Sequence, residues 1–246
     1  MQVLKAVFAR FWAVWAIIAF VVTMLIFLIP IILFALPAKE PVSTRRFLNI
    51  ARVWMGIFLP LVGCPLTVRG RENFAPGQQY IVICNHNSLM DIPISSPSIP
   101  GGNKTIAKVE FTKVPLFGLI YKLGSVLVDR KSDKSRKESF AKMKKVLDDG
   151  MHMCIYPEGT RNKTSEPIKA FHDGAFRLSI DTQRAIIPGI IFFTRYVNPA
   201  EEKFYLLPHR LLIEFQAPIA PLPGETVEAL KDRCWQIMYN RIAAGA

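Results

Sequence analysis

The sequence has few cysteines, and no two of them are close together. Cys64, Cys84, Cys154 and Cys234 are scattered singly over 246 residues, without a C-x-x-C pair. This spacing argues against a zinc site, a redox dithiol and a disulfide framework, and it favours free thiols in a reducing compartment. A zinc-finger pattern and an RNA-recognition signature are also missing, so we expect no nucleic-acid partner.

Acidic residues are the scarcer of the two charged classes. The chain has 19 Asp and Glu against 31 Lys and Arg, which gives a formal net charge of +12. The excess lies in two blocks: residues 1–60 carry six basic and one acidic side chain, and residues 101–150 carry twelve basic and six acidic ones. Such blocks fit anionic lipid headgroups, phosphorylated substrates or an acidic carrier protein. For the 131–145 segment, a plainly solvated helix face remains the simpler alternative.

The N-terminal region is strongly apolar. Residues 11–36 contain no charge, and a helix of that length spans about 39 Å, enough to cross a hydrocarbon core of about 30 Å. A second apolar stretch, residues 47–62, has Arg52 as its only charge. The two stretches predict either a helical hairpin in one leaflet or a single span followed by a core helix. We therefore expect a membrane anchor over residues 1–62 and a separate domain, which would carry any catalytic site, over residues 63–246.

After Gly63 the pattern becomes that of a globular α/β domain. Short apolar runs alternate with segments whose apolar residues recur every three or four positions, which predicts a sheet flanked by helices. Strands are expected at 66–68, 80–84, 105–109, 125–129, 151–156, 185–193 and 211–215, and helices at 133–149, 172–183 and 227–242.

One of these strands is expected to carry a histidine to its exposed end. The apolar run Ile81-Val82-Ile83-Cys84 is followed at once by Asn85-His86-Asn87-Ser88. If the chain then turns into a helix, the carboxylate of Asp91 folds back beside the imidazole. A carboxylate that accepts one ring N–H leaves the other ring nitrogen free as a general base. The same spacing is also typical of a capped helix start without a catalytic role.

Two other predicted strands end in arginine-containing turns. Arg130 follows the strand at 125–129, and Arg161 follows Tyr156-Pro157-Glu158-Gly159-Thr160. Sites in α/β sheets gather at the carboxyl ends of parallel strands, so these arginines, helped by Lys108, are candidates to clamp a phosphate. For a single arginine, a surface ion pair is the alternative.

Together these segments resemble the four ordered motifs of the glycerolipid acyltransferases. The motifs are Asn85-His86-x4-Asp91; Lys108, Pro115-x2-Gly118 and Gly124-x5-Arg130; Pro157-Glu158-Gly159-Thr160-Arg161; and the apolar Ile187-Pro188. The resemblance covers about residues 65–215 and is closest to the bacterial 1-acyl-glycerol-3-phosphate acyltransferases, which make phosphatidic acid. The chain departs from the pattern at Asn162, where serine is common, and at His172, a position that is often basic.

The resemblance implies an acyl transfer to a lysophosphatidic acid. His86 takes the proton from the sn-2 hydroxyl, Asp91 orients His86, and the hydroxyl oxygen attacks an acyl thioester. Backbone N–H groups after Asn85 are candidates to stabilise the oxyanion. The expected phosphate ligands are Arg130, Arg161 and Lys108, and the expected remainder of the substrate site is Asn85, Glu158, Gly159 and Thr160.

The same resemblance implies the partners and the location. The acyl donor is acyl-CoA or acyl carrier protein, and no metal or other cofactor is expected. The paired N-terminal helices of bacterial members favour the one-leaflet hairpin, on the cytoplasmic face of a bacterial inner membrane. Three alternatives remain: a lyso-aminolipid as acceptor, a non-catalytic membrane scaffold, and Cys84 as an acyl-enzyme nucleophile, although a strand cysteine is more typical of packing.

Overall fold

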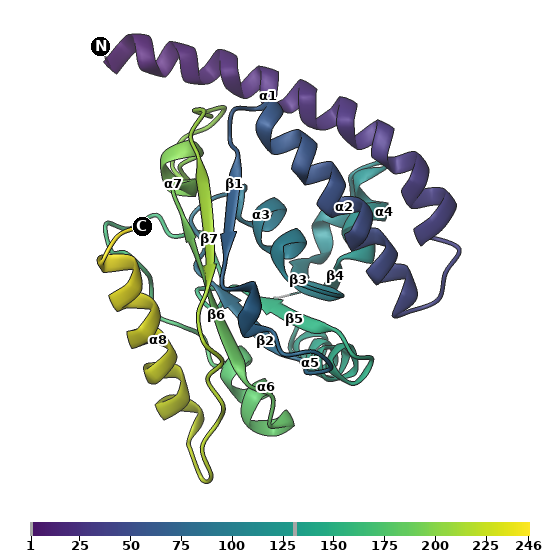
Figure 1. Ribbon diagram of the computed structural model, residues 1–246, viewed down its shortest axis with the longest axis vertical. Helices are drawn as coiled ribbons and strands as arrows, with labels where there is room; N and C mark the ends of the chain where they lie inside the picture. The colour runs from purple at the N-terminus through teal and green to yellow at the C-terminus, as the bar shows by residue number, and fades with distance from the viewer. Residues whose placement is uncertain (1, 130–131) are drawn as a thin grey trace.

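A mixed seven-stranded sheet forms the centre of the molecule in the computed structural model, which describes residues 2–129 and 132–246 (Figure 1). Its order is β1-β7-β6-β2-β5-β3-β4, and every neighbouring pair is parallel except β6 and β7. This confirms the predicted α/β class. The strands are β1 (Leu66–Arg69), β2 (Ile81–Cys84), β3 (Asn103–Lys108), β4 (Ser125–Val128), β5 (His152–Ile155), β6 (Ile186–Phe192) and β7 (Leu211–Phe215).

Helices cover both faces of the sheet, so its central strands are apolar on both sides. In β2, Ile81 and Ile83 belong to one buried cluster, whereas Val82 and Cys84 belong to the other, because successive strand side chains point to opposite faces. The first cluster includes residues of α5 (Asp133–Asp148), α6 (Gly174–Thr182) and α8 (Val227–Ala243). The second includes residues of α2 (Val42–Leu61), α3 (Asp91–Ser98) and α4 (Phe117–Leu123).

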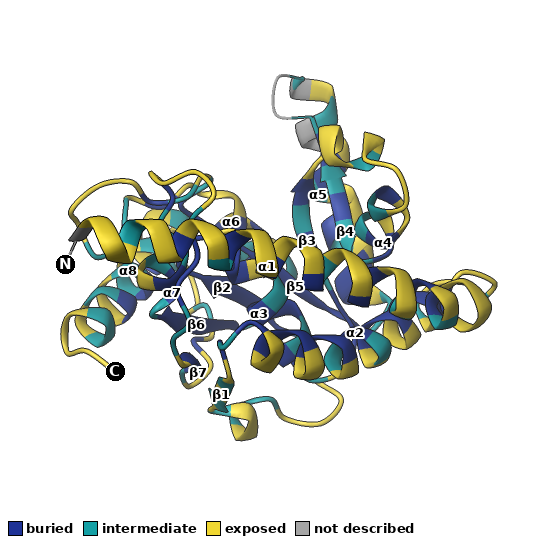
Figure 2. Ribbon diagram, turned by 90° about the horizontal axis from the view of Figure 1, so that it is seen from above, coloured by how far each residue is buried: buried dark blue, intermediate teal, exposed yellow. Residues whose placement is uncertain are grey.

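The two N-terminal helices form a hairpin that packs on the domain. α1 (Gln2–Pro30) continues through a wider π-type segment, η1 (Ile31–Ala35), and α2 then returns beneath it (Figure 1). Within the described residues, one helical stretch, Val3–Ala35, is long and apolar enough to cross a membrane. The outward face of α1 is exposed along its length (Figure 2).

The inward face of the hairpin shares its core with the sheet domain. The indole N–H groups of Trp12 and Trp15 on α1 donate to the carbonyls of Val62 and Leu61, at 2.9 and 3.1 Å. One apolar cluster extends from α1 through α2 to the sheet, so packing is continuous across residue 62. The change of composition there is therefore not a break in the core.

The predicted strands and long helices lie where the periodicity placed them, with ends shifted by at most two residues. The short helices were not predicted, because α3 has eight residues and contains Pro93 and Pro97, and α4 has seven. The remaining short elements are η2 (Arg71–Asn73), η3 (Val109–Lys113) and α7 (Thr194–Val197).

Candidate active site

β2 delivers His86 to the edge where the carboxyl ends of β2, β3, β4, β5 and β6 meet. The residue before it, Asn85, fixes the exit of the strand: its side-chain amide donates to the carbonyl of Ile191 at 2.9 Å and accepts from the N–H of Ile191 at 2.7 Å. Asn85 is 1% exposed. The expectation that Asn85 contacts substrate is therefore wrong, because both ends of its amide pair with the β6 backbone.

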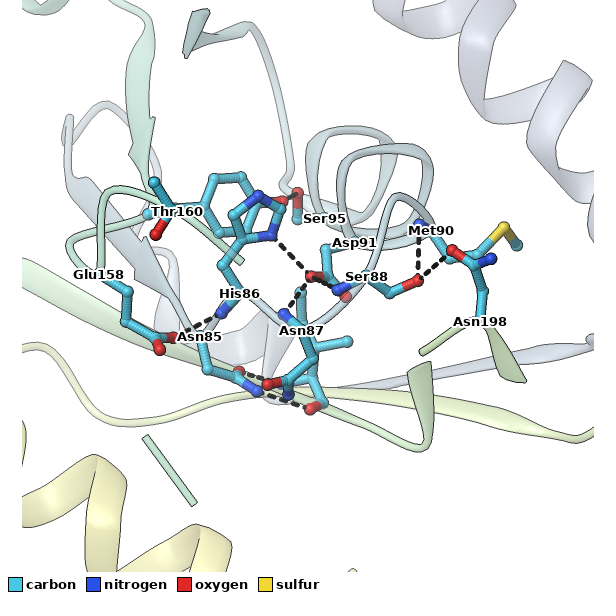
Figure 3. Close-up of polar contacts among 12 residues, drawn as sticks. Asn85, His86, Asn87, Ser88, Met90, Asp91, Ser95, Glu158, Thr160 and Asn198 are labelled. Carbon is cyan, nitrogen blue, oxygen red and sulfur yellow. Dashed lines mark hydrogen bonds and ion pairs between the residues drawn. The ribbon is translucent and has the colours of Figure 1, made fainter. Parts of the chain in front are cut away.

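The predicted contact between His86 and Asp91 is present. The ring Nδ1 of His86 lies 2.8 Å from Oδ2 of Asp91, a carboxylate that is completely buried (Figure 3). The same oxygen accepts the backbone N–H groups of Asn87 and Ser88, each at 2.7 Å. Asp91 is the first residue of α3, so the turn into that helix brings the carboxylate back toward β2. An acceptor at Nδ1 favours the tautomer that leaves Nε2 unprotonated.

This geometry narrows the expected oxyanion site, because most of the backbone N–H groups after Asn85 have partners within the turn. The N–H groups of Asn87 and Ser88 donate to Asp91, and the N–H of His86 donates to Oε1 of Glu158 at 2.7 Å. The N–H of Met90 donates to the Ser88 hydroxyl at 3.1 Å. These four N–H groups after Asn85 are therefore committed to the turn itself and are not free to stabilise an oxyanion.

The turn after β5 holds the backbone of His86 from the other side. Glu158 is buried, and its second oxygen accepts the N–H of Lys169 at 3.1 Å; burial raises the pKa of this carboxyl. The N–H of Asn162 donates to the carbonyl of His86 at 2.6 Å. The carboxylate of Glu158 thus acts on the site through the backbone, which corrects its expected place among the substrate contacts. Asn162, the departure from the family pattern, has a positioning role here.

Tyr156, which the sequence reasoning did not select, forms a platform for His86. The two rings lie 4.4 Å apart between centroids, and the phenol oxygen is 2.7 Å from the hydroxyl of Ser95 on α3. Burial raises the pKa of Tyr156 well above its usual value, so the phenol stays neutral. The available signal was an aromatic residue directly before Pro157-Glu158, at the end of the strand next to β2.

The three remaining residues of the Pro157–Arg161 motif differ in their surroundings. Gly159 has φ +72°, and a Cβ there would lie 2.7 Å from the ring of His172, so a side chain would strain the backbone and displace that ring. Thr160 accepts from Nζ of Lys169 at 2.8 Å, so its hydroxyl is engaged. Arg161 is half-buried, and its side chain has no hydrogen bond or ion pair with any other residue that the structure describes. Its guanidinium is therefore available to an anion.

The structure places one of the other two expected phosphate ligands, Lys108, on the same edge of the sheet. Lys108 is exposed at the carboxyl end of β3, two strands from β2, on the same edge of the sheet as His86. Arg130 lies outside the described residues. The common strand direction nevertheless places the ends of β2, β3 and β5 along one edge.

A second contact missed by sequence reasoning ties the turn after β2 to the segment that follows α7. The Ser88 hydroxyl donates to Oδ1 of Asn198 at 2.9 Å (Figure 3). The Asn198 amide donates in turn to the carbonyl of Tyr205 at 2.8 Å. Ser88 and Asn198 are 110 residues apart in the chain. No local pattern could have paired them.

Cys84 has the surroundings of a packing residue. Its side chain is completely buried, and hydrogen bonding to Cys154 together with burial raises the pKa of its thiol well above the usual value. A thiol in this state is a poor nucleophile. Among the described residues, no group of three or more His, Cys, Asp or Glu side chains is arranged to hold a metal ion.

The fold and this edge of the sheet define an α/β protein with a histidine–aspartate pair at the carboxyl ends of its central strands. The model of the acyltransferase family matches residues 65–192, just over half of the sequence. The chain therefore belongs to the acyltransferase family, as its four motifs predicted.

Individual relatives agree with this assignment. A 1-acyl-sn-glycerol-3-phosphate acyltransferase of Cocos nucifera is 31% identical over 161 residues, which are 65% of this chain and 51% of the relative. A protein of the same name from Borreliella burgdorferi is 28% identical over 144 residues, 58% of this chain and 57% of the relative. The chain thus spans little more than half the length of these curated relatives.

A solved structure shares the whole fold. The crystal structure of the 1-acyl-sn-glycerophosphate acyltransferase of Thermotoga maritima superimposes with a TM-score of 0.79 and covers 99% of this chain and 97% of that chain. The sequence identity is 19%, so this likeness concerns the fold.

Proposed function

We propose that this protein transfers a fatty acyl group from a thioester to the sn-2 hydroxyl of 1-acyl-glycerol-3-phosphate, giving phosphatidic acid. The observation that carries the proposal is the buried carboxylate of Asp91 against Nδ1 of His86, in a chain of the acyltransferase family. No described residue hydrogen-bonds to Nε2 of His86, and the ring is partly exposed. The names of the relatives supply the acceptor class.

In this mechanism His86 acts as a general base on the acceptor. Nε2 removes the proton of the sn-2 hydroxyl while its oxygen attacks the carbonyl carbon of the thioester. The C–S bond then breaks, the ester forms, and the departing thiolate takes the proton from the imidazolium. The negative charge of Asp91, 2.8 Å from the ring, stabilises the imidazolium that forms in between. Acyl-CoA or acyl carrier protein is the co-substrate, and these steps use no metal and no other cofactor.

We place the phosphate of the acceptor near Arg161. Its guanidinium is unpaired among the described residues, and the motif that contains it holds the backbone of His86 through Glu158 and Asn162. An arginine fork matches the oxygens of a phosphate better than an ammonium does. Lys108, on the same edge, and Arg130 complete the proposed set.

α1 is the proposed membrane contact, lying in one leaflet. The helix is hydrogen-bonded to the rest of the protein along its length. The carbonyl of Ala9 accepts the N–H of Leu206, and the indole N–H of Trp12 donates to the carbonyl of Val62. Further along, the hydroxyl of Thr23 accepts the indole N–H of Trp54 at 2.9 Å. A helix held in this way cannot cross a bilayer without taking the domain with it, whereas its exposed outer face can enter the lipid. We place the protein on the cytoplasmic face of a bacterial inner membrane, where anionic lipid attracts basic flanks and free cysteines persist.

A matrix of acyl donors and acceptors tests the function. The full-length protein is assayed with acyl-CoA and acyl carrier protein against lysophosphatidic acid, a lyso-aminolipid and a phosphate-free monoacylglycerol. We expect product with lysophosphatidic acid at a rate at least tenfold above the other acceptors. A preference for the lyso-aminolipid would show that the proposed acceptor is wrong and that the acyl transfer from a thioester is right. The absence of thioester-dependent product with every acceptor would contradict the whole proposal.

A further inference from the structure

A second apolar surface lies beside α1, in the segment that follows β3. Within residues 109–119, here called the lip, five large apolar side chains are between 37% and 47% exposed. They are Val109, Phe111, Val114, Leu116 and Leu119. Isolated exposed apolar residues are ordinary on protein surfaces, but five within eleven residues of the chain are typical of an interaction site.

The lip has a defined shape. The hydroxyl of Thr112 donates to the carbonyl of Val109 at 2.7 Å, and the N–H of Gly118 donates to the carbonyl of Val114 at 2.8 Å. A Cβ on Gly118 would lie 2.3 Å from the carbonyl oxygen of Thr112, so the chain closes tightly on itself there. The apolar side chains are thus presented outward by a folded turn.

The lip lies beside α1, at the edge of the core that α1 shares with the sheet domain. The ring of Phe117, at its end, lies 6.5 Å from the ring of Phe20 on α1. Both views show α4 beside the C-terminal half of α1 (Figures 1 and 2). The exposed apolar side chains of the lip and of α1 therefore lie on neighbouring parts of the fold, on the side where β3 and β4 end.

The charges around the lip suit an anionic lipid surface. Lys108, Lys113 and Lys122 are exposed, and Glu110 is the only acidic residue between positions 108 and 122. Lysines beside an exposed apolar patch are typical of a segment that rests in the headgroup region, because the ammonium groups reach phosphates while the apolar side chains enter the acyl layer.

We propose that the lip is a second membrane-contact element, which enters the same leaflet as α1. This inference rests on the proposed membrane contact of α1. Two contacts on different parts of the fold fix the tilt of the domain, which a single helix lying in the surface does not. The carboxyl end of β3, with Lys108, then faces the lipid from which a lysolipid must be drawn.

The test uses fluorescent labels at single introduced cysteines. The four native cysteines are buried, so a thiol-reactive, environment-sensitive dye attaches to the new site. Phe111→Cys and Val114→Cys report on the lip, Val22→Cys reports on the exposed face of α1, and Leu222→Cys is the control. Leu222 is 56% exposed, in the loop before α8 at the end of the molecule away from α1 (Figure 1). Vesicles of phosphatidylethanolamine and phosphatidylglycerol carry brominated acyl chains as quencher.

The inference predicts quenching at positions 22, 111 and 114 and none at 222. If the label at position 22 is quenched while the labels at 111 and 114 behave like the label at 222, the membrane contact of the lip is refuted and that of α1 stands. The absence of quenching at 22 would contradict the proposed membrane contact itself. Protection of 111 and 114 by acyl carrier protein, without quenching by lipid, would assign the lip to a protein partner and overturn the inference.

A charge substitution provides an independent measurement. The double variant Phe111→Glu/Val114→Glu should bind the same vesicles about tenfold more weakly, whereas Leu222→Glu should bind like the wild type. Circular dichroism verifies that the variants fold. Equal vesicle binding by the double variant and Leu222→Glu would count against a membrane contact of the lip.

Discussion

Replacing Asp91 by asparagine tests the role of the buried carboxylate. The amide oxygen of asparagine can still accept the three hydrogen bonds that Oδ2 accepts from His86, Asn87 and Ser88. What the variant loses is the negative charge beside the imidazolium. Two unit charges about 4 Å apart interact by about 4 kcal/mol at an effective dielectric constant of about 20. Since about 1.4 kcal/mol corresponds to a factor of ten, kcat should fall by about 10³.

The same substitution has a separate effect on stability. Oδ1 of Asp91 is buried and has no hydrogen-bond partner among the described residues, so the new amide NH₂ has no acceptor there. An unsatisfied buried donor costs about 1–3 kcal/mol, and the variant should melt at a lower temperature while remaining folded at 25 °C.

Steady-state kinetics with lysophosphatidic acid and acyl-CoA, combined with thermal melting, separates the two effects. Asp173→Asn is a matched control, because Asp173 is exposed and pairs with Lys231 at 2.9 Å on the surface. It should keep the wild-type kcat. A folded Asp91→Asn protein whose kcat falls less than tenfold would refute the electrostatic role of Asp91.

Three further substitutions test other parts of the account. Cys84→Ser should keep most of the activity, because the buried thiol packs rather than reacts; a variant as inactive as one without His86 would restore the acyl-enzyme route. Arg161→Ala should lower kcat/KM for lysophosphatidic acid by about tenfold or more beyond its effect on a phosphate-free acceptor, since a charge-assisted contact contributes about 1.5–3 kcal/mol; equal losses would make Arg161 structural. Burial lowers the pKa of His152 from 6.5 to about 4, so the unfolded chain takes up this proton first. The free energy of unfolding should therefore fall by about 3 kcal/mol as the pH is lowered from 6.5 toward 4. His152→Asn should remove most of this pH dependence in denaturant titrations, and an unchanged pH dependence would contradict the assignment to His152.

The parts of the site that lie close together in the chain could be predicted from the sequence. The apolar run of β2 predicted the strand, and the five-residue spacing from His86 to Asp91, together with the motifs further along the chain, predicted the turn and the contact between the two side chains. The sheet was predictable for the same reason, because apolar runs of strand length alternate with helical periodicity.

The contacts between distant segments could not be predicted. Asn85 was expected to bind substrate, but its amide pairs with a residue 106 positions away on β6. Glu158 was expected to belong to the substrate site, but its carboxylate accepts the N–H of His86, 72 positions away. A polar residue in a motif has the same sequence signature whether it meets a ligand or a backbone group. The pairing of distant strands decides between the two.

The most direct test of the account is the formation of phosphatidic acid by the full-length protein and by His86→Ala. Product from 1-acyl-glycerol-3-phosphate and an acyl thioester is measured by mass spectrometry. His209→Ala is the control, because it removes a histidine whose ring contacts those of Phe193 and Tyr196. We predict that the wild type and His209→Ala form product, while His86→Ala shows only the background rate. Wild-type product formation that survives in folded His86→Ala would contradict the assignment of His86 as the general base.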